Sequence, residues 1–389
     1  MGFFLPEGSV DNLKYYKYQS EDRSVISKYF LKPYWSRFAD IFPKWMAPNL
    51  ITLSGLGFII FNLLIALKLD PTLTKETPRW TYFSYALGLF MYQTFDGCDG
   101  VHARRIGQSG PLGELFDHSI DSINTTLTLF IFGSVISSGY TFKLLISQFA
   151  LLCNFYFSTW EEYHTHVLFL SEVSGPVEGI LGVCFAFIIT GVFGPELVWH
   201  TKVFEFPYKE GFITLDISDV VICLCIVGLL FNVLSARRNV IDHYKQNKIV
   251  LTANSQIKEA YKGVVPFFCY FLSVFIVSFI NPAFISFPFV LSVGLSIAFV
   301  VGRIIVNHLT LQPFPMYNAP LFIPTIQLIV HKLTVVCFDF DATETTKSLV
   351  WLGFGLTFGL HAFFMNEIIY EFTTYLDVYA LSIKRPKFV

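Results

Sequence analysis

The sequence has little charge. Of its 389 residues, 14% are Asp, Glu, Lys or Arg, whereas 53% are hydrophobic. A water-soluble protein of ordinary composition carries about 25% charged residues. The shortage argues against a soluble globular enzyme. The formal net charge of −2 says little about partners, and we expect no nucleic-acid partner.

Other features are also missing. The apolar runs, such as 51–67 and 267–280, lack the period-two alternation of a transmembrane β-barrel. The first 45 residues hold no apolar stretch followed by a small-residue cleavage site, so we expect no signal peptide there. The seven cysteines show no metal-ligand spacing and lie mostly within apolar runs, which is typical of small buried residues.

Long apolar runs are what the sequence has instead. A helix needs about 20 mostly apolar residues to cross a bilayer. The sequence therefore predicts an all-α fold: a polytopic transmembrane helical bundle of about ten helices, with an N-terminal interfacial helix in the aromatic and basic segment 24–45. The transmembrane helices are expected at residues 49–69, 81–101, 115–137, 141–163, 175–195, 217–238, 263–281, 284–306, 318–338 and 347–375.

Basic residues gather in alternate loops, which predicts the orientation of the bundle. Cytosolic loops are rich in Lys and Arg. Arg104 and Arg105 follow the second expected helix, Arg237 and Arg238 follow the sixth, and acids gather after the odd-numbered helices. Both termini, and the loop after the second helix, are therefore expected in the cytosol.

Four aspartates interrupt the apolar background, in the stretch DGCDGVHARRIGQSGPLGELFDHSID. Asp96 and Asp99 are three residues apart, and Asp117 and Asp121 are four apart, so each pair shares one face of a helix. The segment between the pairs predicts a helix end, a tight turn and a new helix start. Its turn-forming residues are Gly107, Gly110, Pro111 and Gly113.

Two antiparallel helices joined in this way would point all four carboxylates into one pocket. Hard oxygen ligands favour Mg²⁺, Mn²⁺ or Ca²⁺. Four carboxylates suffice to bridge two ions, which can clamp a pyrophosphate during displacement at phosphorus. The alternative is a hydrated loop with ordinary surface acids, and the regular spacing argues against it.

The spacing matches D-x-x-D-G-x-x-A-R-x8-G-x3-D-x3-D at every fixed position. In this signature the chain resembles the CDP-alcohol phosphotransferases. The stretches PLGELFDHSIDSIN, STWEEYHTH and LDVYALSIK are similar to the fungal choline- and ethanolaminephosphotransferases of that family, and the similarity extends over nearly the whole chain. Asp96, Gly97 and Val101 resemble the ethanolamine enzymes more than the choline enzymes.

The resemblance implies a reaction. Phosphoethanolamine, or phosphocholine, passes from CDP-ethanolamine or CDP-choline to the 3-hydroxyl of diacylglycerol, which gives the phospholipid and CMP as the last step of the CDP-alcohol (Kennedy) pathway. It also implies Mg²⁺ or Mn²⁺ as cofactor, with two ions expected per site. It further implies a homodimer in endoplasmic reticulum and Golgi membranes, with the active site facing the cytosol.

The resemblance also assigns roles to residues. Asp96, Asp99 and Asp117 are the implied metal ligands. Asp121 is the implied general base for the lipid hydroxyl and a further candidate metal ligand. The residues expected to bind the CDP-alcohol are Asn49, Gly100, Arg104 and Gly113. For Asn49, a plain helix N-cap is an equally good interpretation.

Several other polar residues lie near the expected cytosolic helix ends. Tyr92, Glu178 and His308 are candidates for lipid or headgroup contacts, and His308 is an alternative base. In the sequence EEYHTH at 161–166, the histidines at positions i and i+2 do not share a helical face, so they are not expected to bind a metal together. The stretch therefore predicts a solvated helix end.

These expectations divide the chain into five parts. They are a cytosolic segment 1–48 with the interfacial helix, catalytic transmembrane helices at 49–238, a cytosolic linker at 239–262, further transmembrane helices at 263–375 and a cytosolic tail at 376–389.

Three alternatives to the ethanolamine enzyme stay open. The chain could be mainly a cholinephosphotransferase. It could use another alcohol, although family members that do so are typically about half this length. It could also be a divalent-cation transporter, but transporter sites tend toward the bilayer midplane within inverted repeats, and the sequence shows no such repeat.

Overall fold

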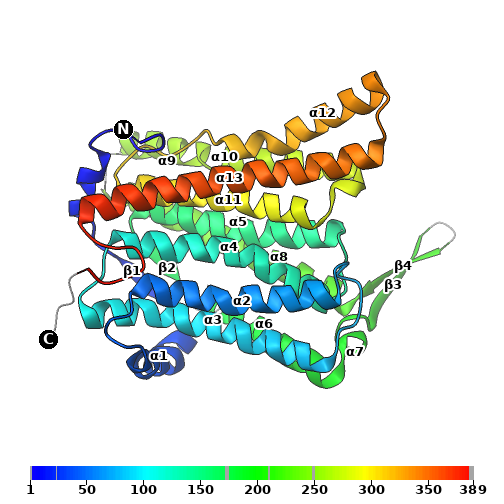
Figure 1. Cartoon of the computed structure of the whole chain (residues 1–389), viewed down its shortest axis with the longest axis horizontal. Helices are drawn as coiled ribbons and strands as arrows, with labels where there is room; N and C mark the ends of the chain where they lie inside the picture. The colour runs from blue at the N-terminus through cyan, green and yellow to red at the C-terminus, as the bar shows by residue number, and fades with distance from the viewer. Residues whose placement is uncertain (1, 23, 171–174, 209–210, 248–249, 385–389) are drawn as a thin grey trace.

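Long helices that run back and forth between two ends build the protein (Figure 1). The computed structural model describes residues 2–22, 24–170, 175–208, 211–247 and 250–384. Within these residues, ten helices have 16 residues or more. They are α2 (Pro48–Leu69), α3 (Arg79–Ile106), α4 (Pro111–Val135), α5 (Phe142–Thr165), α6 (Pro176–Phe193), α8 (Ile217–Asn247), α10 (Val265–Ile280), α11 (Phe287–Leu309), α12 (Ile323–Phe338) and α13 (Ala342–Leu376).

Each predicted transmembrane range overlaps one of these long helices, although α3, α8 and α13 extend beyond theirs. Seven helical spans of the described residues are long and apolar enough to cross a membrane. Helices α3, α4 and α5 are long but carry too many polar residues to be counted among them. The prediction of a helical membrane bundle is therefore confirmed, and its number of about ten crossings is supported only for these seven.

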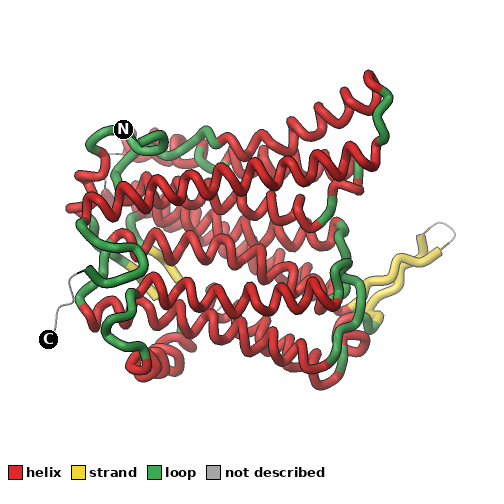
Figure 2. The backbone as a smooth tube through the Cα atoms, viewed as in Figure 1, coloured by secondary structure: helices red, strands yellow, loops and turns green. Residues whose placement is uncertain are grey.

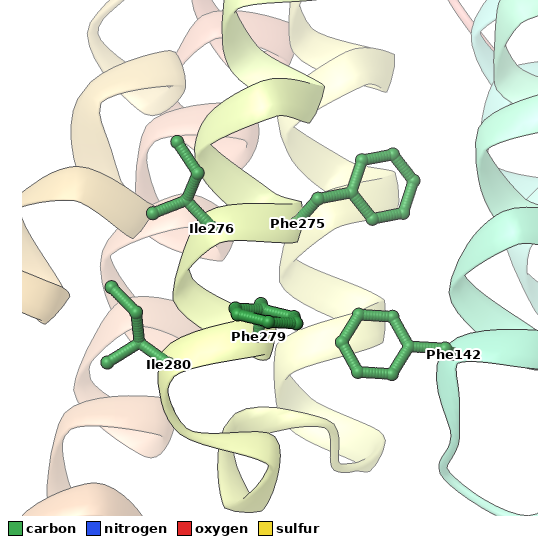
Figure 3. A pocket seen from close by; sticks show the side chains of 5 residues that line it. All are labelled: Phe142, Phe275, Ile276, Phe279 and Ile280. Atoms are coloured by element: carbon green, nitrogen blue, oxygen red, sulfur yellow. The ribbon is translucent and has the colours of Figure 1, made fainter. Parts of the chain in front are cut away.

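The outer surface of the bundle is apolar. On α8, Leu224, Leu230 and Phe231 expose more than half of their surface. An open hollow near one end of the bundle is lined only by apolar side chains of α5 and α10, among them Phe142 and Phe279 (Figure 3). Contiguous apolar surface of this kind is unstable in water. Together with the apolar helices, it indicates an integral membrane protein.

Helix α11 is the most buried of the candidate spans and forms the centre of the bundle, where it packs against α4, α5 and α13. Helix α3 packs against both α2 and α6, and α2 also packs against α4. The two helices that carry the aspartates are therefore held by neighbours on several sides.

The N-terminal segment crosses one end of the bundle before α2 begins. It contains the 3-10 helix η1 (Ser9–Tyr15), the π-helical turn η2 (Ser27–Leu31), helix α1 (Lys32–Phe38) and the 3-10 turn η3 (Ala39–Ile41). Leu31, Trp35 and Ala39 face the bundle and are buried. A helix thus lies in the segment where an interfacial helix was expected. Both termini lie at this same end (Figure 1).

Two small sheets correct the all-α prediction (Figure 2). Strand β1 (Ser20–Asp22) pairs in parallel with β2 (Leu168–Leu170), and β3 (Lys202–Tyr208) forms an antiparallel hairpin with β4 (Gly211–Asp216). The β-branched and aromatic residues of KVFEFPY favour a strand between the two predicted helices. Strand β1 gives no signal of its own, because its partner lies far away in the sequence.

The expected linker 239–262 is helical where the structure describes it. Helix α8 continues to Asn247, and α9 (Val250–Lys262) follows, so the described part of the linker is helical. Ala253 and Ala260 of α9 are buried, while its other faces are polar. Polar composition alone therefore does not distinguish a linker from an amphipathic helix that packs on the bundle. The remaining short elements are α7 (Pro195–Trp199), η4 (Pro282–Phe284) and η5 (Ala319–Phe322).

The predicted turn between the two aspartate pairs is confirmed. Helix α3 ends at Gly107, which has the left-handed conformation (φ 67°) and donates its N–H to the carbonyl oxygens of Ala103 and Arg104. Helix α4 starts at Pro111, which has no N–H to leave unpaired in the first turn. A glycine stop and a proline start therefore fix where the two helices meet.

This turn yields a stability prediction. Gly107→Ala should lower the free energy of unfolding by about 1 kcal/mol, because a Cβ is strained at positive φ. Gly110→Ala is the matched control, since Gly110 has extended backbone and a Cβ added there would meet no atom within 4 Å. Thermal unfolding in detergent should show a lower midpoint for Gly107→Ala alone, and equal midpoints would contradict the assigned role of Gly107.

Candidate functional site

Three of the four aspartates converge between α3 and α4. One carboxylate oxygen from each of Asp96, Asp99 and Asp117 lies within 4.8 Å of one from each of the other two. We call these residues the aspartate triad. The spacing on one face of α3, and the antiparallel return of α4, bring together three of the four carboxylates that the sequence predicted for one pocket.

The triad is suited to a cation. The Oδ1 atoms of Asp96 and Asp117 are buried and have no hydrogen-bond partner among the described residues. Close carboxylates repel one another, and buried anions without partners are unstable. A hard divalent cation such as Mg²⁺ or Mn²⁺ would satisfy these oxygens, because such ions take carboxylate ligands. The donor set therefore fits the expected metal.

Asp121, which lies outside the triad, has a hydrogen-bond partner of its own. The hydroxyl of Tyr92 donates to Asp121 Oδ1. Tyr92 is 1% exposed and lies one helical turn before Asp96 on α3. Tyr92 thus links the fourth aspartate to the helix that carries two members of the triad.

Asp99 has a partner that sequence reasoning missed. Thr52 of α2 is buried, and its hydroxyl donates to Asp99 Oδ2. Nothing in the local sequence around Thr52 signals this contact, because it depends on how α2 packs against α3. The hydroxyl orients one carboxylate of the triad.

The residues expected at the CDP-alcohol lie on three helices. Asn49 faces Gly113: a Cβ at Gly113 would lie 4.0 Å from the Asn49 Oδ1 atom. The Asn49 amide donates to the carbonyl oxygen of Ala380 at 3.0 Å. Ala47 is the N-cap of α2, so the alternative interpretation of Asn49 as N-cap is wrong. On α3, the exposed Arg104 guanidinium lies beside Gly100.

Two further candidates make other contacts. Glu178, in the first turn of α6, accepts a hydrogen bond from the Ser24 hydroxyl of the N-terminal segment. His308, at the end of α11, stacks against His166 with ring centroids 5.0 Å apart. The structure therefore groups Tyr92 with the aspartates through Asp121, and places Glu178 and His308 in contacts of their own.

The prediction of a solvated end for EEYHTH is wrong. Glu161 and Glu162 are 6% and 5% exposed. Glu162 Oε2 lies 3.6 Å from the Nδ1 atom of His118, the residue after Asp117, and Glu161 accepts a hydrogen bond from Asn239. The polar residues of this stretch predicted exposure to solvent, but contacts with α4 and α8 cover this end of α5.

The N-terminal segment reaches the same region, which the sequence did not indicate. The Tyr16 hydroxyl donates to Glu114 Oε2 at 2.7 Å. Burial, together with the charge of Glu114, raises the pKa of the Tyr16 phenol. The Tyr16 phenol is therefore a neutral hydrogen-bond donor near the site at neutral pH.

The geometry predicts how the aspartates share metal binding. Asp117→Asn should weaken Mn²⁺ binding by about tenfold or more, because it removes one charged ligand, worth about 1.4 kcal/mol or more. Asp121→Asn should weaken it less, because Asp121 is bonded to Tyr92. Electron paramagnetic resonance of Mn²⁺ titrated into purified protein measures both affinities. A larger loss for Asp121→Asn would contradict the grouping.

Known proteins resemble this chain along its full length. A family described as CDP-alcohol phosphatidyltransferase matches residues 45–206, which include the triad and Asp121. The chain is 57% identical to a choline/ethanolaminephosphotransferase and 53% identical to a cholinephosphotransferase, both of Saccharomyces cerevisiae, with all of each chain covered. It is 30% identical to an ethanolaminephosphotransferase of Mus musculus, over 95% of this chain and 92% of the mouse protein.

The family expectation drawn from the aspartate spacing is therefore confirmed, and the cation-transporter alternative is not favoured. The matched proteins align with this chain over nearly their whole length, and those named as enzymes are phosphotransferases. The chain belongs to the CDP-alcohol phosphotransferase family of transferases.

Proposed function

We propose that this enzyme transfers phosphoethanolamine, and also phosphocholine, from the CDP-alcohol to diacylglycerol. The single observation that carries the proposal is the convergence of Asp96, Asp99 and Asp117 in a chain that matches choline/ethanolaminephosphotransferase from end to end. The matched proteins that are named for both alcohols support dual use.

The proposed reaction is a displacement at phosphorus. The lipid hydroxyl oxygen forms a bond to the phosphorus of the phosphoalcohol, and the bond from that phosphorus to the CMP oxygen breaks. The hydroxyl proton passes to Asp121. One Asp121 oxygen accepts the Tyr92 hydrogen bond, so the other is the proposed proton acceptor. A positioned base of this kind compensates for the weak nucleophilicity of a neutral hydroxyl.

When bound at the triad, two Mg²⁺ or Mn²⁺ ions would supply the positive charge that a pyrophosphate needs. Asp96, Asp99 and Asp117 are the proposed ligands, with Asp121 as a further one. The proposed contacts to the CDP-alcohol are Asn49, Gly100, Arg104 and Gly113. The exposed Arg104 guanidinium is suited to a phosphate oxygen. Small residues at positions 100 and 113 leave room for the nucleotide.

The lipid and the headgroup are proposed to approach from the end of the bundle that holds the aspartates. Tyr92, Glu178 and His308 remain the candidates for contacts to them. Glu178 and His308 already contact Ser24 and His166, so any role of theirs would include those neighbours. His308 remains the alternative base.

We further propose that α3, α4 and α5 cross the membrane together with the seven apolar spans, which gives ten crossings. Their lengths of 28, 25 and 24 residues suffice, and they pack inside the bundle. The basic loops support a cytosolic active site and cytosolic termini. The five-part division of the chain, a homodimer, and location in endoplasmic reticulum and Golgi membranes are proposed from the family resemblance alone. Arg385 and Lys387 of the basic tail lie outside the described residues.

A cholinephosphotransferase is the second candidate, because the chain is 53% identical to one over its full length. Purified enzyme in detergent with Mg²⁺ and diacylglycerol is expected to release CMP from both donors, and faster from CDP-ethanolamine. Faster release from CDP-choline would favour the second candidate. Absence of CMP from either donor, with active lipid present, would refute the proposed function.

The base assignment gives a further prediction. Asp121→Asn should lower turnover by about 100-fold or more, because a positioned base typically contributes 10²–10⁴-fold. Binding of the CDP-alcohol should fall only modestly, since the triad is intact. Asp96→Asn is the contrast and should weaken metal and nucleotide binding together. Wild-type turnover by Asp121→Asn would show that another group accepts the proton.

A further inference from the structure

Helix α1 packs against the stretch of α3 that carries two members of the triad. Trp35 of α1 is buried, as are Leu31, Ala39 and Phe42 of the flanking turns, and the four form one cluster with Ile51 and Cys98. On the other side of the same segment, Tyr29 and Phe30 are 64% and 70% exposed. This segment therefore presents one aromatic face to the bundle and another to its surroundings.

The closest contact is between Trp35 and Gly97. A Cβ placed on Gly97 would lie only 2.8 Å from the indole Cζ2 atom, and closer still to two other ring atoms. Real side chains do not approach so closely, so only glycine at position 97 admits the Trp35 ring. The next residue, Cys98, directs its thiol to the Trp35 carbonyl oxygen at 3.5 Å. Both residues between Asp96 and Asp99 thus contact Trp35.

The contact continues along α3. The Arg105 Nη1 atom donates to the carbonyl oxygen of Ala39 at 2.9 Å, and His102 Nε2 lies 3.0 Å from the carbonyl oxygen of Met46. The rings of Phe42 and Phe95 meet edge to face, with centroids 5.1 Å apart. The segment 35–46 therefore contacts α3 from position 95 to position 105.

The contacts of segment 35–46 lie mainly on the side of α3 opposite the carboxylates. An α-helix turns by about 100° per residue. Gly97, Val101 and Arg105 therefore fall on the face of α3 that is turned away from the face shared by Asp96 and Asp99. On the carboxylate side, Thr52 of α2 bonds to Asp99. The turn of α3 that carries both carboxylates is thus fixed from two opposite directions.

We propose that Trp35 is a positioning residue for the metal site, which acts through Gly97. Its ring fills the space that a side chain at 97 would take and fixes the backbone between Asp96 and Asp99. A displacement of about 1 Å at a reacting group can cost 10²-fold in rate. The inference rests on the proposed role of the triad as metal ligands.

The test is a double-mutant cycle on Mn²⁺ binding, measured by electron paramagnetic resonance on purified enzyme without substrate. Gly97→Ala is expected to weaken binding by about tenfold, because overpacking forces the ring and the helix apart. Trp35→Ala is expected to weaken it less, since it removes the support without adding a clash. The double variant should bind Mn²⁺ as Trp35→Ala alone does, because the added methyl group then meets no ring.

Two outcomes would overturn the proposal: Gly97→Ala binds Mn²⁺ as wild type does, or the two losses simply multiply in the double variant. Trp35→Val, which also carries no ring, replaces Trp35→Ala under the same criteria if the latter does not purify as a folded protein. Gly57→Ala in α2 is the matched control, because open space surrounds that position. CMP release is measured separately, so a failure of the proposed reaction would be seen without any change in the Mn²⁺ result.

Discussion

Mutual repulsion between close carboxylates is the constraint on which the rest of this structure depends. Two like charges about 4 Å apart repel by about 1 kcal/mol in water and by about 4 kcal/mol at the effective dielectric near a protein surface. The three carboxylates of the triad form three such repelling pairs. Such an arrangement is stable when a divalent cation neutralises it and when the helices that carry it cannot spread.

Much of the surrounding structure resists that spreading. The turn from Gly107 to Pro111 ties the ends of α3 and α4 together. Thr52 and Tyr92 hold individual carboxylates by hydrogen bonds, and α1 supports α3 from behind. These contacts come from α2, from α3 itself and from the N-terminal segment. The site is therefore a property of the assembled bundle more than of the signature stretch that supplies its ligands.

The location of the site follows from the same arrangement. The N-terminal segment crosses the end of the bundle and contacts Glu114 through Tyr16 and Glu178 through Ser24. The C-terminal segment returns to this end and meets Asn49 at Ala380. Both ends of the chain thus contact residues at the end of the bundle that holds the aspartates, while the apolar hollow of Figure 3 lies toward the hairpin end of the bundle.

Sequence reasoning succeeded where a local pattern has one structural meaning. The predicted helical ranges overlap every long helix, of which seven spans are apolar enough to cross a membrane, and the glycine–proline stretch placed the turn between the aspartate pairs. It failed where polarity was ambiguous. Polar residues of EEYHTH bond to other helices, and the stretch 239–262, helical in its described part, packs through Ala253 and Ala260 while it exposes most of its polar residues. Strand β1 depends on a partner that lies almost 150 residues away in the chain.

By itself, the sequence determined the membrane class, the family and the four aspartates, because composition and short-range spacing fix helical faces and turns. Only the tertiary structure decided how those aspartates divide: three converge, and the fourth bonds to Tyr92. It alone showed that Thr52 orients Asp99 and that Trp35 lies against Gly97. Contacts between different helices depend on their relative placement, which no local spacing specifies.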